Sequence, residues 1–415
     1  MGYRTGSADL PLHGGRVPAW LSERMAKLGR VLVEAIVFHY GRKELLRRMS
    51  HPFWFQSLGC VMGMDWHSSG ITTSVVGALK RGLAPIENEL GIHVCGGRGR
   101  HSRRTPDELR ALGDRLGFDA ATHVRASRLV AKVDSAAVQD GFQIYFHSFV
   151  VTDDGDWTVV QQGMNEEVGQ ARRYHWLSEG LHSFVDEPHS AIEGQPGPPI
   201  VNLTDHRAGP SRYAQLELAL EGPERVLEEL ARIQTERGQL PLPHLQMPAH
   251  HEVTAKDLVL RRLHVALAAA RERGPKDFAE LLLTPGLGAR TVLALAMVAE
   301  VLHGAACRFS DPARFSVAHG GKDGHPFPVP LRVYDQTLRV MREAVNQAKL
   351  GREEKLAAIR KLDHQARRLE QTIGGLSWEK FENLERAHSA EYHGMTVHGP
   401  APSVPRARAH GKATG

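Results

Sequence analysis

The feature that most restricts the fold is a pair of apolar segments separated by a glycine-rich turn. The sequence FAELLLTPGLGARTVLALAMVAEVLHG occupies residues 278–304. Leucine, alanine and methionine dominate both flanks and favour helix, whereas Pro285 and Gly286 between them favour a turn. We therefore predict a short helix that ends at Leu283 and a longer helix that begins near Ala289.

The turn between these two helices has the composition of an anion-binding site. Gly286 and Gly288 allow the backbone to approach a ligand closely, and the first turn of a helix offers unpaired N–H groups. Arg290 adds a positive charge at the same end. The Pro-Gly-hydrophobic-Gly core resembles the helix-hairpin-helix element of DNA repair enzymes and transposases, which implies contact with the nucleic-acid backbone. The alternative is a plain helical hairpin whose glycines only turn the chain.

Length and composition predict a multi-domain cytoplasmic protein. The chain has 415 residues, of which 41% are hydrophobic, enough for two or three domains. A formal charge of +5 permits a polyanionic partner without requiring one. Three cysteines are too few for a disulfide framework, and we find no signal-peptide core or membrane-spanning run. We expect no membrane association, and self-association into a homo-oligomer stays open.

Secondary-structure signals divide the chain into a sheet-containing first half and a helical second half. Helical and strand-like patterns alternate in the first half, which predicts an α+β or α/β domain with a mixed sheet. The second half predicts an all-helical domain that contains the helix-hairpin-helix. The predicted parts are 1–185 for a candidate catalytic domain, 186–253 for loop, helix and linker, 254–375 for the helical domain, and 376–415 for a partly disordered basic tail.

Four local predictions determine where the candidate residues fall. Residues 54–64 are short and apolar, which predicts a buried strand. Residues 105–108 (Thr-Pro-Asp-Glu) predict a helix start with a threonine cap and a capping box. Residues 122–139 predict a further helix. The runs 143–152 and 157–162 flank an Asp-Asp-Gly-Asp turn, which predicts a β-hairpin.

An acid and a histidine after the predicted strand form a candidate metal site. Asp65 and His67 are two residues apart, so on an extended strand they share a face. Asp140, beside the predicted hairpin, is the third candidate ligand. Such a set would hold Mg²⁺ or Mn²⁺, which activates water and stabilises a leaving oxygen. This predicts a metal-dependent phosphodiesterase or nuclease, although no PD-(D/E)xK or HNH signature is present.

The crowding of polar residues between positions 65 and 176 indicates that some of them share a pocket. Two adjacent glutamines, 161 and 162, end the second strand of the hairpin, and one must face inward, where its amide needs partners. Taken singly, each of these residues also has an ordinary structural interpretation. The candidate catalytic residues are Asp65, His67, Lys132, Asp134, Asp140, His147, Gln162 and His175.

Basic residues gather in two further places. Residues 96–104 hold four arginines and three glycines before a predicted helix, which indicates a phosphate-binding loop or a solvated basic loop. The run Arg-Arg-Tyr-His-Trp at 172–176 suits phosphate pairing with base stacking. HGGKDGHP at 319–326 is a candidate substrate loop or an irregular connection. The candidate nucleic-acid-binding residues are Arg98, Arg100, Arg103, Arg104, Arg172, Arg173, Gly286, Gly288, Arg290 and Lys322.

Long motifs in the chain resemble one prokaryotic family. RTGSADLPLHGG, PFWFQSLGCVMGMDWHSSGITT, VQDGFQIYFHSF, VVQQGMN, ARRYHWLS and FSVAHGGKDGHP are similar to the family labelled domain of unknown function 763. The resemblance spans residues 3 to about 345 and implies a single intact family member. It implies no activity and no catalytic residues. Arg98 and Arg100 stand where lysines are expected in relatives, which preserves the charge.

Three functions stay open on the sequence alone. The first is a DNA-binding, metal-dependent nuclease or related DNA-processing enzyme, with DNA favoured over RNA. The second is a non-catalytic DNA-binding protein of repair or chromosome maintenance. The third is a base-excision glycosylase, for which Asp311 lies at a suitable distance after the turn but lacks the expected Thr-His-Val sequence behind it. Walker, Rossmann and paired CxxC motifs are absent, which disfavours an ATPase, a dehydrogenase or a zinc finger.

Overall fold

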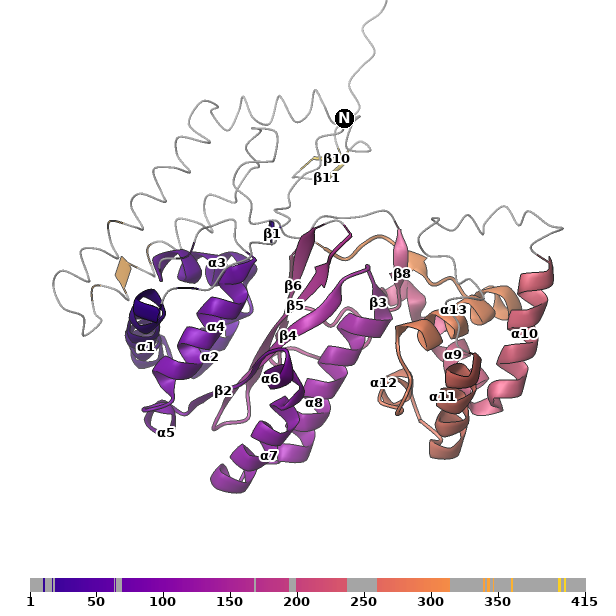
Figure 1. Ribbon diagram of the computed structural model, residues 1–415, viewed down its shortest axis with the longest axis horizontal. Helices are drawn as coiled ribbons and strands as arrows, with labels where there is room; N and C mark the ends of the chain where they lie inside the picture. The colour runs from indigo at the N-terminus through magenta and orange to yellow at the C-terminus, as the bar shows by residue number, and fades with distance from the viewer. Residues whose placement is uncertain are drawn as a thin grey trace, which may run out of the picture.

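An antiparallel sheet with helices on both faces forms the centre of the molecule (Figure 1). The computed structural model describes residues 10–11, 17, 19–62, 64, 69–167, 169–193, 199–236 and 260–313, and a few positions between 339 and 400. None of the helices described has the length and apolar character of a membrane span.

The central sheet has six strands in the order β1-β6-β5-β4-β2, with β7 also paired to β6. All of its described pairs are antiparallel, so the expectation of a mixed sheet is wrong and the arrangement is α+β. The predicted hairpin is confirmed as β4 and β5. The strands are β1 (Leu10–Pro11), β2 (Ile92–Arg98), β4 (Gln143–Thr152), β5 (Trp157–Asn165), β6 (Gln170–Leu177) and β7 (Ala191–Glu193).

The first helical layer covers one face of this sheet. Its helices are α1 (Ala19–Tyr40), α2 (Arg42–Met49), α3 (Pro52–Val61), α4 (Gly70–Leu83) and α5 (Glu87–Leu90). The prediction of a strand at residues 54–64 is wrong, because most of this segment is α3. Its buried residues Phe55, Leu58 and Met62 recur at helical spacing, but a short apolar run alone does not distinguish a buried strand from a buried helix.

The second helical layer begins with α6 (Arg100–Arg103), α7 (Thr105–Leu116) and α8 (Ala120–Lys132). The predicted start of α7 is confirmed, but the threonine cap and the capping box are wrong. Thr105 is the first residue of the helix, the N-cap position is Arg104 without a side-chain cap, and the Thr105 hydroxyl donates to the Ser102 carbonyl. Glu108 Oε2 instead accepts from Lys80 Nζ at 2.6 Å and from the Gly96 amide at 3.0 Å. The helix predicted over 122–139 is confirmed for most of its length, and it ends in the π-helical turn η1 (Val133–Ala137).

A smaller sheet and the remaining helices complete the second layer. The small sheet has the order β3-β8-β9 and follows η1. Residues of α12 and α13 belong to the same hydrophobic core cluster as Phe149 and Trp157 of the central sheet. The predicted domain boundaries stay predictions. The elements are β3 (Val138–Gln139), β8 (Ile200–Asn202), η2 (His206–Ala208), α9 (Gly209–Glu221), α10 (Pro223–Glu236), α11 (Leu260–Arg273), α12 (Phe278–Leu282), α13 (Ala289–His303) and β9 (Arg308–Phe309), with β10 (Met395–Thr396) and β11 (Gly399–Pro400) forming a separate pair.

Because helices cover both faces of the sheet, neighbouring residues on one strand face two different cores. On β5, Gln161 is opposite His147, whereas Gln162 is opposite Arg173. Both glutamines are fully buried. We expected one of them to face inward, and the covered sheet buries both. Two separate polar networks result, one on each face.

Candidate functional site

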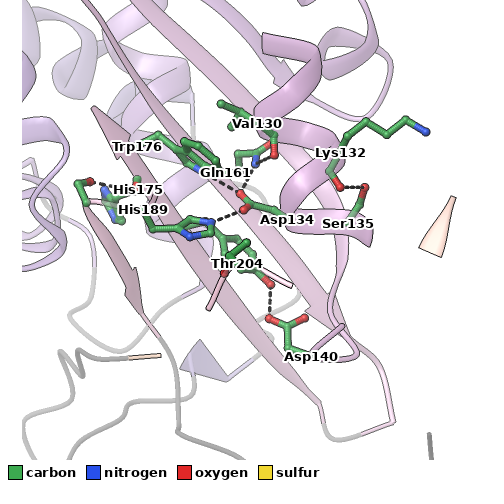
Figure 2. A network of polar contacts seen from close by, with 12 residues as sticks. Val130, Lys132, Asp134, Ser135, Asp140, Gln161, His175, Trp176, His189 and Thr204 are labelled. Carbon is green, nitrogen blue, oxygen red and sulfur yellow. Dashed lines mark hydrogen bonds and ion pairs between the residues drawn. The ribbon is translucent and has the colours of Figure 1, made fainter. Parts of the chain in front are cut away.

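Asp134, in the π-helical turn after α8, is the centre of the polar network in Figure 2. Its Oδ2 accepts hydrogen bonds from Trp176 Nε1 at 3.0 Å and from Gln161 Nε2. Its Oδ1 accepts from His189 Nε2. The carboxylate has no exposure to solvent. Single π-helical turns are frequent at functional sites, so the position of Asp134 is one where functional residues are often found.

The network continues from Asp134 through Gln161 to His147. Gln161 Oε1 accepts from His147 Nδ1 at 2.6 Å, and Ser127 Oγ lies 2.9 Å from His147 Nε2. Since Nδ1 carries the proton that faces the amide oxygen, Nε2 accepts the serine hydroxyl proton and the ring is neutral. Burial lowers the pKa of His147, which agrees with a neutral ring.

Gln162 organises the network on the opposite face of the sheet. Its Oε1 accepts from the Thr72 hydroxyl, and its Nε2 donates to Tyr145 Oη at 2.6 Å and to the Ser69 carbonyl at 3.1 Å. The Gln162 amide therefore has partners on both its oxygen and its nitrogen. A catalytic role for Gln162 stays a prediction.

His175 lies on the same face as Gln162 and is fully buried. Its Nδ1 faces the Met49 carbonyl oxygen at 3.0 Å, and its Nε2 accepts from Arg173 Nε at 2.9 Å. Burial, followed by the neighbouring Arg173 charge, holds the pKa of His175 well below its usual value. The ring is thus a neutral link in the core, with both nitrogens engaged.

Arg172 and Arg173 lie inside the protein and not on its surface. Arg172 pairs with Asp140 at 3.0 Å and with Asp311 at 2.9 Å, and its exposure is 3%. Arg173 has no exposure and donates to Gln56 at 2.9 Å. Guanidinium groups enclosed in this way present no surface to a duplex, so the expectation that this pair binds phosphate is contradicted.

Asp140 does not fit a metal ligand in this arrangement. Besides Arg172, its carboxylate accepts from Tyr174 Oη at 2.7 Å and from the Phe142 amide at 3.1 Å, so a cation there would face a guanidinium. Burial raises the pKa of Asp140, and Arg172 opposes that shift. Within the described residues, no group of three or more His, Cys, Asp or Glu side chains is placed to hold a metal ion. Asp65, His67 and Lys322 lie outside the described residues.

Lys132 faces away from the Asp134 network and contacts the turn before α13. Its Nζ donates to the Leu287 carbonyl, and Gln139 Nε2 donates to the Ala289 carbonyl at 2.9 Å. Burial lowers the pKa of Lys132. These contacts join the end of the predicted 122–139 helix to the predicted anion site. A catalytic role for Lys132 stays a prediction.

The turn before α13 leaves the N-terminus of this helix without a side-chain cap. Gly286 has φ +81°, which favours glycine, whereas Gly288 has the extended φ of −134°. Gly288 is the N-cap of α13 without any side-chain hydrogen bond, and a β-carbon there would meet nothing within 4 Å. Arg290 is exposed in the first turn of this helix. Only Gly286 is therefore required for the backbone conformation.

The arginine-rich segment is on the surface. Arg98 ends β2, and the residues that follow form α6 and the start of α7. Arg98, Arg100, Arg103 and Arg104 are all exposed, and within the described part of the chain none of them pairs with a carboxylate. The Arg98 guanidinium lies 5.7 Å from the centre of the Tyr145 ring. This position suits contact with an external anion.

The fold and the networks define an α+β protein with an antiparallel sheet covered on both faces, and with a polar network buried on each. The chain matches, over residues 6–329, the model of a family described as protein of unknown function (DUF763), and it belongs to that family. No curated protein and no solved structure matches it.

His189 is the member of the Asp134 network that sequence reasoning missed. It lies in the segment between β6 and β7, which carries no local motif. The one available signal was a total of 24 histidines, which does not select a position. Trp176 is the last residue of the Arg-Arg-Tyr-His-Trp run at 172–176, but only the fold directs its indole N–H toward Asp134.

Proposed function

We propose that this protein binds the phosphodiester backbone of nucleic acid, DNA in preference to RNA, with α12, the turn and α13 acting as a helix-hairpin-helix. The observation that carries the proposal is the start of α13 at an uncapped glycine with open space beside it. The first N–H groups of a helix have no intrahelical acceptor and favour an anion. A phosphate oxygen suits that position.

Two further features support this function. Lys132 and Gln139 hold the carbonyls of Leu287 and Ala289, so the turn is fixed before a ligand arrives and less ordering is needed on binding. The exposed arginine segment at residues 98–104 adds positive charge, which attracts phosphate irrespective of base sequence. We expect affinity for many sequences and a strong dependence on salt.

The replacement Gly288→Asp tests the proposal directly. Aspartate is a good N-cap, and this position accepts a β-carbon, so the free energy of unfolding should change by only a few tenths of a kcal/mol. Its carboxylate would occupy the first N–H groups and repel phosphate. Affinity for a labelled duplex, measured by fluorescence anisotropy at low salt, should fall by roughly tenfold or more, which is about 1.4 kcal/mol.

Gly274→Asp is the charge control, because it adds the same charge at an exposed glycine before α12 where a β-carbon meets nothing within 4 Å. The Gly274 backbone is left-handed, with φ +58°, a conformation that aspartate adopts more readily than most residues. It should bind DNA like the wild type. Gly288→Ser caps the helix without charge and separates the two effects. If Gly288→Asp binds as tightly as the wild type, the turn is only a structural corner and the proposal fails.

A metal-dependent nuclease reaction stays a prediction, and it rests on Asp65 and His67. Binding of Mn²⁺ to the full chain, measured by calorimetry, should be lost in Asp65→Asn if these residues are ligands. Cleavage of DNA that EDTA abolishes would point the same way. Binding of DNA without turnover would favour the non-catalytic alternative. The glycosylase alternative loses its candidate, because Asp311 is buried against Arg172.

A further inference from the structure

Three histidines belong to the buried networks, and they differ in how their ring nitrogens are used. Both nitrogens of His147 are engaged, by Gln161 and Ser127. Both nitrogens of His175 are engaged as well, within the opposite network. His189 donates from Nε2 to Asp134, whereas its Nδ1 has no hydrogen-bond partner among the residues that the structure describes. Of the three rings, only His189 keeps a nitrogen available for a proton.

The surroundings of His189 suit proton transfer. The His189 side chain is 7% exposed to solvent, whereas the Asp134 side chain beside it is fully buried. Within the described chain Asp134 pairs with no lysine or arginine, so an imidazolium at His189 would be its counter-charge. A buried carboxylate of this kind orients the ring and stabilises the positive charge that forms when Nδ1 accepts a proton.

The other partners of Asp134 keep its carboxylate in place. Trp176 and Gln161 both donate to Oδ2, which leaves Oδ1 to His189. The Trp176 ring also lies against the His189 ring, with 4.5 Å between the ring centroids. The tautomer follows from these contacts, because a proton on Nε2 in the neutral ring leaves the lone pair on Nδ1.

We infer that His189 is a general base for hydrolysis of a phosphodiester, with Asp134 as its positioning residue and water as the only co-reactant. The choice of a phosphodiester rests on the proposed function. Nδ1 of His189 takes one proton from water while the water oxygen forms a bond to phosphorus. The bond from phosphorus to the leaving oxygen breaks, and that oxygen receives the proton from the imidazolium, directly or through solvent. The ring returns to its neutral state, and the products are a phosphomonoester and an alcohol.

The test uses the full chain, EDTA throughout, and two substrates: labelled DNA and the small diester bis(p-nitrophenyl) phosphate. The wild type should hydrolyse both substrates. His189→Gln keeps an N–H group that can donate to Asp134, but the glutamine side chain cannot accept a proton from water. Its rate should fall by about 10²- to 10⁴-fold, the usual contribution of a general base, while DNA affinity stays unchanged.

His206→Gln is the matched control, because His206 also pairs with an aspartate, Asp186 at 3.0 Å, but its side chain is 80% exposed. It should hydrolyse like the wild type. Asp134→Asn tests the positioning role through a readout that simple loss of packing would not give. Removing the carboxylate charge should lower kcat for the small diester while KM stays unchanged, because Asp134 orients His189 and does not itself contact the substrate. Thermal unfolding of each variant separates loss of fold from loss of chemistry.

The outcomes distinguish this inference from the proposed function. If the wild type binds DNA but hydrolyses neither diester in EDTA, the inference is overturned and the proposed function stands. If hydrolysis of the small diester depends on His189 but DNA does not bind, the role of His189 stands and the proposed function fails. Hydrolysis that is unchanged in a folded His189→Gln variant also overturns the inference.

Discussion

The Lys132 amine donates a hydrogen bond to the Leu287 carbonyl oxygen across 155 residues of chain. Gln139 makes the equivalent contact with Ala289. The two contacts attach the turn and the start of α13 to the end of α8 and to β3. The turn was recognised in the sequence from its own residues alone. In the structure, two residues from the first half of the chain hold it in place.

Replacing Lys132 with Met should show what this attachment contributes. The variant keeps the aliphatic chain but leaves the Leu287 carbonyl without its donor, so the free energy of unfolding should fall by about 1.5–3 kcal/mol. DNA affinity should fall as the turn loosens. Urea unfolding and DNA titration measure the two effects. Lys276→Met, at an exposed position, is the control, and equal stability of the two variants would contradict the attachment.

Arg172 and Arg100, which the sequence placed in one class, should behave differently when each is replaced by Met. Arg172→Met leaves the buried Asp140 and Asp311 carboxylates without their cation and should cost about 3–5 kcal/mol of unfolding free energy. Arg100→Met is a surface change, within about 0.5 kcal/mol of the wild type, and should weaken DNA binding. Denaturant unfolding distinguishes them, and similar midpoints would contradict the buried position of Arg172.

The exposed arginine segment should set part of the salt dependence of DNA binding. Each phosphate contact contributes about 0.9 to the slope of log K against log salt on duplex DNA. Replacing Arg98, Arg100, Arg103 and Arg104 with Ala should reduce that slope by up to roughly 3.6 if all four touch phosphate. Titrations at several salt concentrations measure the slope. An unchanged slope would show that the segment does not contact DNA.

Stability should decrease in mild acid because His175 is held neutral. Burial lowers its pKa in the folded state, so the unfolded chain binds a proton below about pH 6.5 while the folded chain does not. The stability present above that pH is lost as pH falls toward the folded pKa, by up to about 1.4 kcal/mol per pH unit.

His175→Gln isolates this effect. A glutamine can donate to the Met49 carbonyl and accept from Arg173, but it does not titrate. Unfolding measured from pH 7.5 to 5 should give a shallower pH dependence than in the wild type. His182→Gln, at an exposed position, should leave the dependence unchanged. Parallel curves for His175→Gln and the wild type would contradict a neutral His175.

Several local features were predictable because their causes are local. The hairpin of β4 and β5 follows from two β-rich runs around an Asp-Gly turn, and the two helices around Gly286 follow from helix formers around Pro-Gly. The start of α7 was also predictable, but the role of Glu108 was not. The sequence offered the Glu108 side chain a local partner in the capping box with Thr105. In the fold it accepts instead from the distant Lys80 amine and Gly96 amide.

By itself the sequence determined which residues are polar, that the β4–β5 hairpin and the helices around Gly286 form, and that a glycine turn precedes α13. Only the tertiary structure decided which polar groups are buried together. Arg172 and Arg100 have the same side chain, yet one is enclosed by two carboxylates and the other is exposed. Likewise, His189 meets Asp134 only because the chain returns to the sheet edge 55 residues later. Periodicity reports on neighbours within a few residues, whereas a buried polar group takes its partners from wherever the chain brings them, because desolvation without a partner is costly.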